Sequence, residues 1–155
     1  MPTRSVPIST LSRLRMLSLV ADERRPRGLL DTSVVIDLER LDPKQLPIES
    51  AVSAITMAEL AAGPHATQDA AERARRQDRL QRAEAAFDPL PFDSEASRAL
   101  GRVYAAVVGA RRKARGARAV DLLIAATACS TGLPLYTRNP DDFQALQDLI
   151  EVVPV

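Results

Sequence analysis

Carboxylate and amide side chains recur where a predicted strand gives way to a helix. These positions are Asp31, Glu59, Asp121, Asn139 and Asp142. If the strands are parallel, their carboxyl ends share one edge of the sheet, where open α/β sheets bind ligands. Carboxylates crowded at such an edge repel one another unless a cation neutralises them. Oxygen ligands without histidine or cysteine favour Mg²⁺ or Mn²⁺, which could activate a water molecule for attack on a phosphodiester.

Each of these acids also has a purely structural explanation. Asp31 stands before two hydroxyl residues and a helical run, which is a common N-terminal signal of a helix. Glu59 and Asp121, both expected in the first turn of a helix, could simply complement the helix dipole. This explanation fits Asp121 less well, because its helix is apolar enough to be buried and a carboxylate there needs a compensating partner.

A dense basic run at residues 111–118 leads directly to Asp121. In a purely structural interpretation, the run is the solvated C-terminal end of a helix, where positive charges interact favourably with the helix dipole. Beside a carboxylate cluster, its arginines could instead hold the phosphate oxygens of a substrate. Arg112 and Arg118 are therefore candidate substrate-binding residues, and any arginine of the run could serve.

The order of the predicted elements favours a parallel sheet that would bring the acids together. Strands are predicted at residues 29–30, 51–55, 133–137 and 151–155, the last at an edge. Helices are predicted at residues 32–39, from a Thr56 cap to Gly63, at 68–87, after a cap at Asp93, and at 119–132. Strands that alternate with helices are typical of an α/β fold with helices on both faces of the sheet.

One predicted helix shows its core face clearly. In the helix that follows Asp93, apolar residues recur at three-to-four spacing, which predicts a buried stripe. The residues of this stripe are Ala96, Leu100, Val103, Tyr104, Val107 and Val108.

The composition limits the class of protein. A chain of 155 residues fits one domain, and with 46% hydrophobic but only 3% aromatic residues its core must be aliphatic. So few aromatic residues argue against a platform that stacks bases, and a nucleic acid would instead be recognised through its phosphates and its shape. The single histidine, His65, excludes a histidine triad, and the single cysteine, Cys129, excludes an internal disulfide. Neither a secretory signal nor a transmembrane span is predicted, so we expect a cytoplasmic protein without a membrane partner.

Residues 1–27 differ from the rest of the chain. They are rich in arginine and proline, and their short apolar run is interrupted by serine and arginine. We therefore expect a basic, flexible N-terminal extension at residues 1–27, followed by one domain at residues 28–155.

Four motifs taken in order resemble those of a known family. LLDTSVVID, TMAELAAG, AVDLLIAATA and LYTRNPDDF look like the motif set of PIN-domain ribonucleases, and among them of VapC-type toxins from bacterial toxin–antitoxin pairs. Each motif alone is weak, but four in order at such spacing form a strong signal. The resemblance implies a three-layer α/β/α PIN-like domain with a mostly parallel central sheet. It also implies Mg²⁺-dependent cleavage of RNA within the strand, inhibition by a small cognate antitoxin, and a homodimer.

The resemblance also assigns roles to residues. Asp31 and Asp121 match the acids that hold the metal, and Glu59 matches a further catalytic acid. Hydroxyl positions that line the same site are matched by Thr32, Ser33 and Thr137. The fourth acidic position is less clear, because Asn139 stands where family members carry Asp or Asn, and Asp142 lies one turn further on.

Two other functions are compatible with parts of the sequence. In a phosphatase that resembles the haloacid dehalogenase group, Asp31 would be a covalent nucleophile, but a second Asp is expected two residues later, where Ser33 stands. A PIN-like module without catalytic activity could instead bind RNA or a protein. The acids retained at three positions argue against this alternative.

Overall fold

The central element of the structure, a computed structural model, is a sheet of four parallel strands. The structure describes residues 23–110 and 117–155. The strands are β1 (Arg27–Leu30), β2 (Glu49–Ala51), β3 (Leu135–Thr137) and β4 (Val152–Pro154), and their order in the sheet is β2-β1-β3-β4. Because all three pairings are parallel, the carboxyl ends of the strands lie at one edge. The predicted parallel α/β sheet, with the C-terminal strand at an edge, is confirmed.

Helices and short 3₁₀ turns connect the strands. The α-helices are α2 (Thr32–Ile36), α3 (Ala54–Ala62), α4 (Ala70–Ala86), α5 (Ser94–Gly109) and α6 (Ala117–Thr131). The 3₁₀ turns are η1 (Leu38–Arg40), η2 (Pro43–Gln45), η3 (Gly63–Ala66) and η4 (Pro140–Leu146). Among the described residues, no helix has the length and apolar character needed to cross a membrane.

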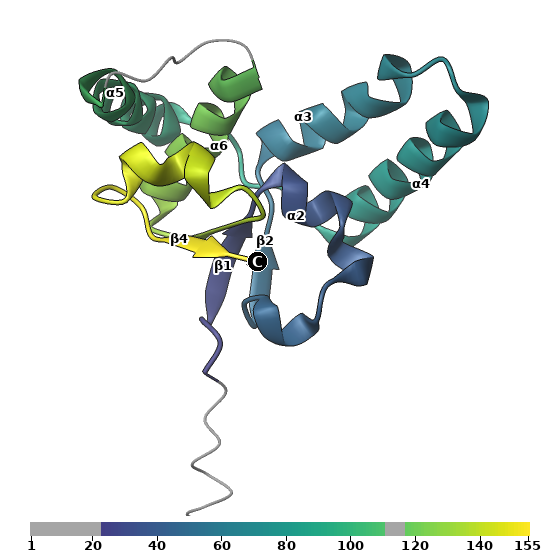
Figure 1. Cartoon of the computed structure of the whole chain (residues 1–155), viewed down its shortest axis with the longest axis horizontal. Coiled ribbons are helices and arrows are strands. Elements are labelled where there is room, and N and C mark those ends of the chain that lie inside the picture. The colour runs from purple at the N-terminus through teal and green to yellow at the C-terminus, as the bar shows by residue number, and fades with distance from the viewer. Residues whose placement is uncertain (1–22, 111–116) are drawn as a thin grey trace, which may run out of the picture.

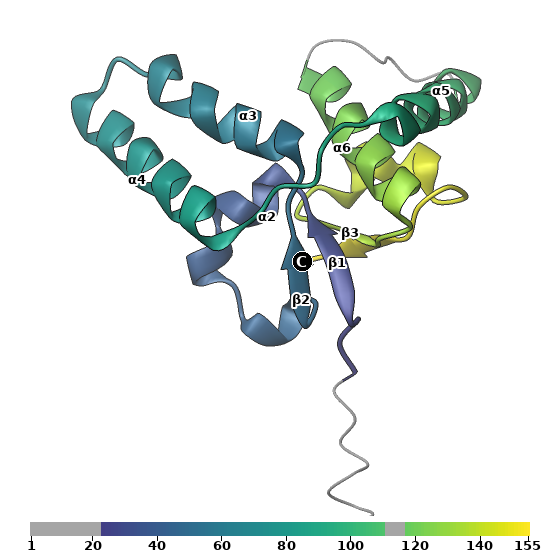
Figure 2. The same cartoon turned by 180° about the vertical axis from the view of Figure 1, so that it is seen from behind.

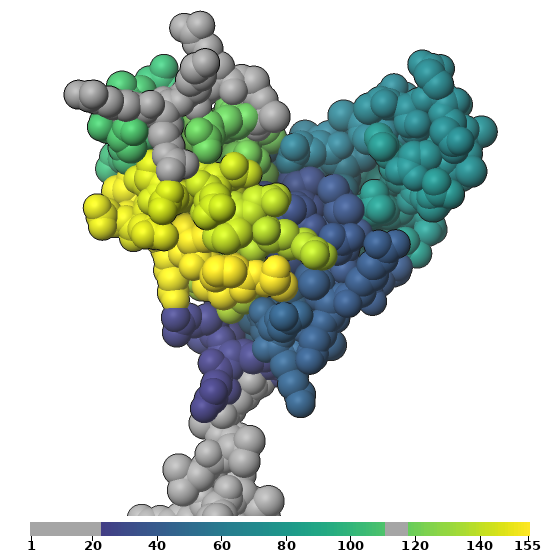
Figure 3. Space-filling model, in the orientation of Figure 1, coloured from purple at the N-terminus to yellow at the C-terminus, as the bar shows by residue number. Residues whose placement is uncertain are grey.

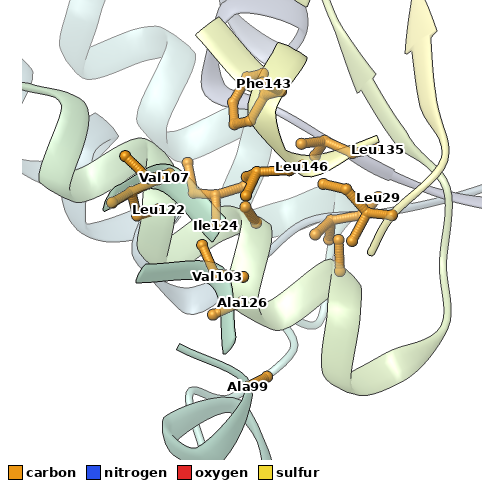
Figure 4. Packing of buried hydrophobic residues seen from close by; sticks show 13 residues of the cluster. Leu29, Ala99, Val103, Val107, Leu122, Ile124, Ala126, Leu135, Phe143 and Leu146 are labelled. Carbon is orange, nitrogen blue, oxygen red and sulfur yellow. The ribbon is translucent and has the colours of Figure 1, made fainter. Parts of the chain in front are cut away.

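The pleat of the strands creates two hydrophobic cores, one on each face of the sheet. Neighbouring residues of a strand point to opposite faces. Leu29 and Leu135 therefore pack with α5, α6 and η4, as Figure 4 shows, whereas Leu30 and Tyr136 pack with α2, α3 and α4. This arrangement confirms the three-layer α/β/α architecture.

The helices form two lobes above the sheet. In Figures 1 and 2, α3 and α4 extend together to one side of α2, while α5 packs beside α6 on the other side. The space-filling view in Figure 3 shows that the surface is hollowed between the two lobes. The carboxyl ends of β1 and β3 lead to the floor of this hollow, so residues that follow these strands are brought toward it.

Several boundaries of helices and strands differ from the predictions. The helix predicted at residues 32–39 ends at Ile36 as α2, and the 3₁₀ turn η1 follows it. The strand predicted at residues 51–55 lies earlier in the chain, because β2 spans Glu49–Ala51 and α3 begins at Ala54. The predicted cap at Thr56 is also wrong: Ser53 caps α3, and its hydroxyl accepts the N–H of Thr56 at 3.0 Å. Similarly, α6 begins at Ala117, inside the basic run, and therefore starts earlier than predicted. The predicted end at Gly132 is confirmed, since this residue has a φ of 67°, which glycine adopts without strain.

The predicted core face of α5 is only partly correct. Ala96, Val103 and Val107 are buried, but Tyr104 and Val108 are each 51% exposed. The reason is that α5 packs against the rest of the fold along one narrow stripe, on which Ala99 takes a place beside Val103. Three-to-four spacing is compatible with two adjacent stripes on a helix. The stripe that contains Ala99 is buried, whereas the one with Tyr104 and Val108 is exposed.

Gly28 leaves room for an aromatic ring. A Cβ atom at this position would lie 2.8 Å from Cδ2 of Tyr136, on the neighbouring strand β3. We therefore expect Gly28→Ala to lower the free energy of unfolding by about 1–3 kcal/mol, because overpacking displaces the buried ring. Gly101, in the middle of α5, is the matched control, since a Cβ there would meet nothing within 4 Å. Gly101→Ala should stabilise the protein by about 0.5–1 kcal/mol. Urea unfolding of both variants checks this pair, and equal effects would contradict it.

Candidate active site

Asp31 lies at the floor of the hollow, where β1 passes into α2. Its side chain is 4% exposed and caps α2, accepting the N–H of Thr32 on Oδ1 at 2.8 Å. The other carboxylate oxygen, Oδ2, accepts the hydroxyls of Ser33 and Thr137, each at 2.8 Å. A carboxylate held by hydrogen bonds to both oxygens has a fixed orientation, so Asp31 is well placed to act on a bound group.

Glu59 approaches Asp31 from α3. It lies in the second turn of this helix rather than the predicted first turn, because α3 begins at Ala54. The hydroxyl of Thr32 donates to Oε2 of Glu59, and the backbone N–H of the same residue donates to Asp31. Thr32 therefore joins the two carboxylates, although they belong to different helical segments.

Asp121 comes from α6, on the opposite side of the hollow. It lies in the second turn of α6, not at its start as predicted, since the helix extends back to Ala117. The pKa of this carboxyl is raised to about 7, first by burial. The negative charges of Asp31, Asp142 and Glu59 contribute to the same rise, and Arg118 acts in the opposite direction. The acids predicted at separate strand ends are thus close enough to perturb one another.

The two candidates for the fourth position differ in their surroundings. Asp142, in η4, pairs with Arg118 at 3.7 Å, and its charge reaches Asp121. Asn139 is exposed and contributes its backbone N–H, which donates to the hydroxyl of Thr137 at 3.0 Å. Among these two residues, Asp142 therefore brings the charge to the cluster. Arg112 lies outside the described residues.

Three residues at this site did not emerge from the sequence. Arg138 donates its backbone N–H to Ser33 at 3.2 Å and its guanidinium to Asp37 at 2.6 Å, so it joins the loop after β3 to α2. The position of Arg138 beside Asn139 was a usable signal. Ser53 and Thr56 lie buried at the start of α3 and had been assigned only to helix capping or a strand.

The set of donors can be compared with the needs of metal ions. Within residues 23–110 and 117–155, no three Cys, His, Asp or Glu side chains converge closely enough to form a finished metal cage. Mg²⁺ does not require one, because it retains several waters and often takes only one or two protein carboxylates. Three acids raise the pKa of Asp121, and among the described residues Arg118 is the one positive charge that lowers it. This excess of negative charge suits the binding of a cation.

A separate groove lies on the other side of α2. Its volume is about 410 Å³, and it is lined by residues of α2, η1 and α4, which include Val35, Ile36 and Arg79, and by Phe87 directly after α4. Asp31, Glu59, Asp121 and Asp142 do not line it. The groove is therefore distinct from the acidic site.

Comparisons with known proteins agree with this fold. Residues 28–149 match the PIN domain family. Ribonuclease VapC5 of Mycobacterium tuberculosis (strain ATCC 25618 / H37Rv) is 37% identical over 128 residues, which are 81% of this chain and 91% of that protein.

Solved structures give the same result. VapBC-5 of M. tuberculosis, a member of the VapBC family of toxin–antitoxin systems, contains a chain that superimposes with a TM-score of 0.74 at 36% identity. That match covers 84% of this chain and 99% of the solved one. FitAcB of Neisseria gonorrhoeae matches with a TM-score of 0.60 at 26% identity, over 80% of this chain and 94% of the other. The chain therefore belongs to the PIN-domain family and, within it, to the VapC-type ribonucleases.

Proposed function

We propose that this chain is a metal-dependent endoribonuclease and the toxic member of a toxin–antitoxin pair. The observation that carries the proposal is the raised pKa of Asp121, caused by burial and by the charges of three other acids at the carboxyl edge of a parallel sheet. Such electrostatic strain costs stability and is common at functional sites. The similarity to Ribonuclease VapC5 supports RNA as the substrate class.

The proposed cofactor is Mg²⁺, with Mn²⁺ as a possible substitute. Ribonucleases of this family generally depend on a divalent metal ion, and the oxygen donors at this site suit a hard cation. Asp31 and Asp121 would hold the ion, with Glu59 and Asp142 close to it. When bound, it would lower the pKa of a water molecule and stabilise the charge that develops on the scissile phosphate.

The side chains around Asp31 and Glu59 are proposed to have separate roles in the reaction. Ser33 and Thr137 hold Asp31 in one orientation, and because Thr137 is fully buried we assign it to this positioning rather than to substrate contact. Thr32 occupies Oε2 of Glu59, so Oε1 is the atom proposed to accept the proton of the attacking water.

Basic residues are proposed to bind the RNA backbone. The Arg118 side chain is 25% exposed and its guanidinium lies 3.7 Å from Asp142, so it can donate to phosphate oxygens next to the acids. Arg112 remains a candidate from the sequence for the same role. These contacts would position RNA without reading its bases.

Metal binding should depend on pH. The Asp121 carboxyl, with a pKa of about 7, must lose its proton before it can bind a cation, so the affinity should fall about tenfold per pH unit below 7. At pH 8, Mg²⁺ at about ten times its Kd should raise Tm by about 3–5 °C. At pH 5.5 the same concentration should have almost no effect. Thermal scans with MgCl₂ check this prediction, which equal shifts at both pH values would contradict.

The proposed partners are an antitoxin and a second copy of the chain. The antitoxin is supported by the solved VapBC-5 structure, which comes from a toxin–antitoxin system. The homodimer is supported by the family resemblance, and light scattering of the purified chain tests it.

A growth assay tests the proposed toxin activity. Induced expression of the wild-type chain in a bacterial host should arrest growth and leave cut RNA in the cells. Expression of Asp31→Asn at the same level should do neither, while its RNA binding should persist. Growth arrest by the variant equal to that by the wild type would refute the catalytic proposal and favour a binding module.

A further inference from the structure

Five polar or charged residues are buried in the part of the chain that the structure describes. Among the described residues these side chains are Asp31, Ser53, Thr56, Thr127 and Thr137. Thr127 donates to the carbonyl of Leu123, one turn earlier in α6, so its hydroxyl is satisfied within its own helix. Thr137 holds Asp31 directly. The hydroxyls of Ser53 and Thr56 are fully buried, and they form hydrogen bonds neither within α6 nor to Asp31. Burial of a hydroxyl lowers the stability of the fold unless the hydroxyl is hydrogen-bonded.

Ser53 and Thr56 belong to a chain of hydroxyls that ends on Glu59. The Oγ of Ser53 lies 3.3 Å from Oγ1 of Thr56, which lies 3.1 Å from Oγ1 of Thr32. The hydroxyl of Thr32 is hydrogen-bonded to Oε2 of Glu59. The chain thus runs from the cap of α3 through the first residue of α2 and back to the second turn of α3.

The number of protons fixes the direction of this chain. Each hydroxyl has one proton to donate, and a carboxylate can only accept. Thr32 must therefore donate to Glu59 and accept from Thr56, and Thr56 must in turn accept from Ser53. The Oγ of Ser53 accepts the backbone N–H of Thr56. This bond fixes the position of the Ser53 hydroxyl, which is the first donor in the chain. Successive hydrogen bonds of this kind polarise one another.

We propose that Ser53 and Thr56 are positioning residues for the cleavage reaction, which act by orienting the Thr32 hydroxyl onto Glu59. This proposal rests on the ribonuclease function proposed above. Neither residue would touch RNA, since both side chains are completely buried. Without the Thr56 proton, the Thr32 hydroxyl is free to turn toward another acceptor, and Glu59 loses its fixed orientation.

The test removes the Thr56 hydroxyl while keeping its volume. Thr56→Val should lower kcat about tenfold with KM unchanged, because a misplaced catalytic group affects the chemical step and not RNA binding. Thr56→Ser, which retains the hydroxyl, should restore kcat to within about twofold of the wild type. The matched control is Thr127→Val, the same change at an equally buried threonine outside the site, and it should leave kcat as in the wild type.

A double-mutant cycle separates positioning of Glu59 from a general effect. If Thr56 acts through Glu59, then Thr56→Val should cause no further loss of kcat in a Glu59→Gln background. The proposal would be overturned by unchanged kcat in Thr56→Val, by failure of serine to restore it, by an equal loss in Thr127→Val, or by independent effects in the cycle. If Thr56→Val does not fold, Ser53→Ala interrupts the same chain one step earlier. It is judged by its loss of kcat, by recovery of kcat in Ser53→Thr, which retains the hydroxyl, and by the same cycle with Glu59→Gln.

Failure of the proposed function would be recognised separately. A folded wild-type protein that cuts no RNA would refute the ribonuclease proposal without deciding the role of the hydroxyls. The same cycle is then measured by urea unfolding. Coupling between Thr56→Val and Glu59→Gln would support the proposed chain, and additive effects would overturn it.

Discussion

Asp31→Asn is expected to lower the rate of RNA cleavage about 1,000-fold or more and to leave the fold intact. The fold should survive because asparagine caps a helix as well as aspartate does, and Asp31 caps α2 through Oδ1. Cleavage should fail because the substitution removes a charge from a buried position, where a neutral amide holds a cation poorly. The amide N–H₂ group would also face the hydroxyls of Ser33 and Thr137, which now donate to this side chain.

Asp93→Asn is the matched control for this prediction. Asp93 caps α5 as Asp31 caps α2, accepting the N–H of Ala96 at 2.9 Å, but it is exposed and is not among the charges that raise the pKa of Asp121. The same chemical change there should leave the cleavage rate within about twofold of the wild type. Single-turnover cleavage of labelled RNA gives both rates. Comparable losses in the two variants would mean that the effect comes from helix capping and not from the site.

Asp121→Asn should stabilise the metal-free protein at pH 8. The Asp121 carboxyl binds its proton more tightly in the folded state, where its pKa is about 7, than in the unfolded state, where it is near 3.8. Folding therefore loses stability as the pH rises from about 4 to 7, and the loss is constant above that range. Solvent screens this half-buried charge, so we expect a gain of about 1 kcal/mol, or about 3 °C in Tm, for the variant at pH 8.

The advantage of Asp121→Asn should depend on both pH and metal. At pH 4 in EDTA most of the advantage of the variant should be lost, because the wild-type carboxyl is then protonated in the folded state and partly protonated in the unfolded state. With Mg²⁺ at pH 8, the wild type should gain stability and the variant should not. Thermal scans in EDTA and in MgCl₂ measure this, with the exposed Asp148→Asn as control. A lower Tm for Asp121→Asn in EDTA at pH 8 would contradict an acidic site under electrostatic strain.

These expectations explain why an acidic site is retained at a cost. A buried carboxyl beside other acids weakens the fold unless something else compensates for it. In the proposed account the compensation comes from the bound cation, so the residues that lower stability are those that supply activity. This is the usual balance between stability and function at an active site.

Much of the fold was predictable because local signals agreed with one another. The apolar pair Leu29–Leu30, followed by Asp31 and two hydroxyl residues, predicts a strand that turns into a helix, and β1 and α2 follow this pattern. Gly132 likewise marks the end of α6. These positions depend on backbone preferences of a few adjacent residues, which the sequence shows directly.

Helix starts were less predictable where several residues could fulfil the same role. Ser53 and Thr56 are both competent caps, and only the finished structure shows that Ser53 is the cap and Thr56 supplies the N–H that it binds. At α6, alanine and arginine before Asp121 are good helix formers, so the helix extends back to Ala117. The acids were nevertheless found, since one turn of a helix does not change the sheet edge at which they lie.

The hydrogen bonds that complete the site could not be predicted. Thr137 and Asp31 are 106 positions apart, and no local sequence pattern indicates that the hydroxyl of Thr137 donates to the carboxylate of Asp31. The same is true of the contact between Thr32 and Glu59, which depends on how α2 and α3 pack. The acids could be identified from residue types alone. The hydroxyl group that orients each acid could be identified only from the tertiary structure.

The most direct test of the account is the cleavage of total RNA by the purified chain with Mg²⁺, with Mn²⁺ and with EDTA. A metal-dependent ribonuclease should produce discrete fragments with either metal ion and none with EDTA, and cleavage should recover when excess Mg²⁺ is added to the chelated sample. Fragments that persist in EDTA would contradict the metal centre. No fragments from folded protein with either ion would contradict the ribonuclease itself.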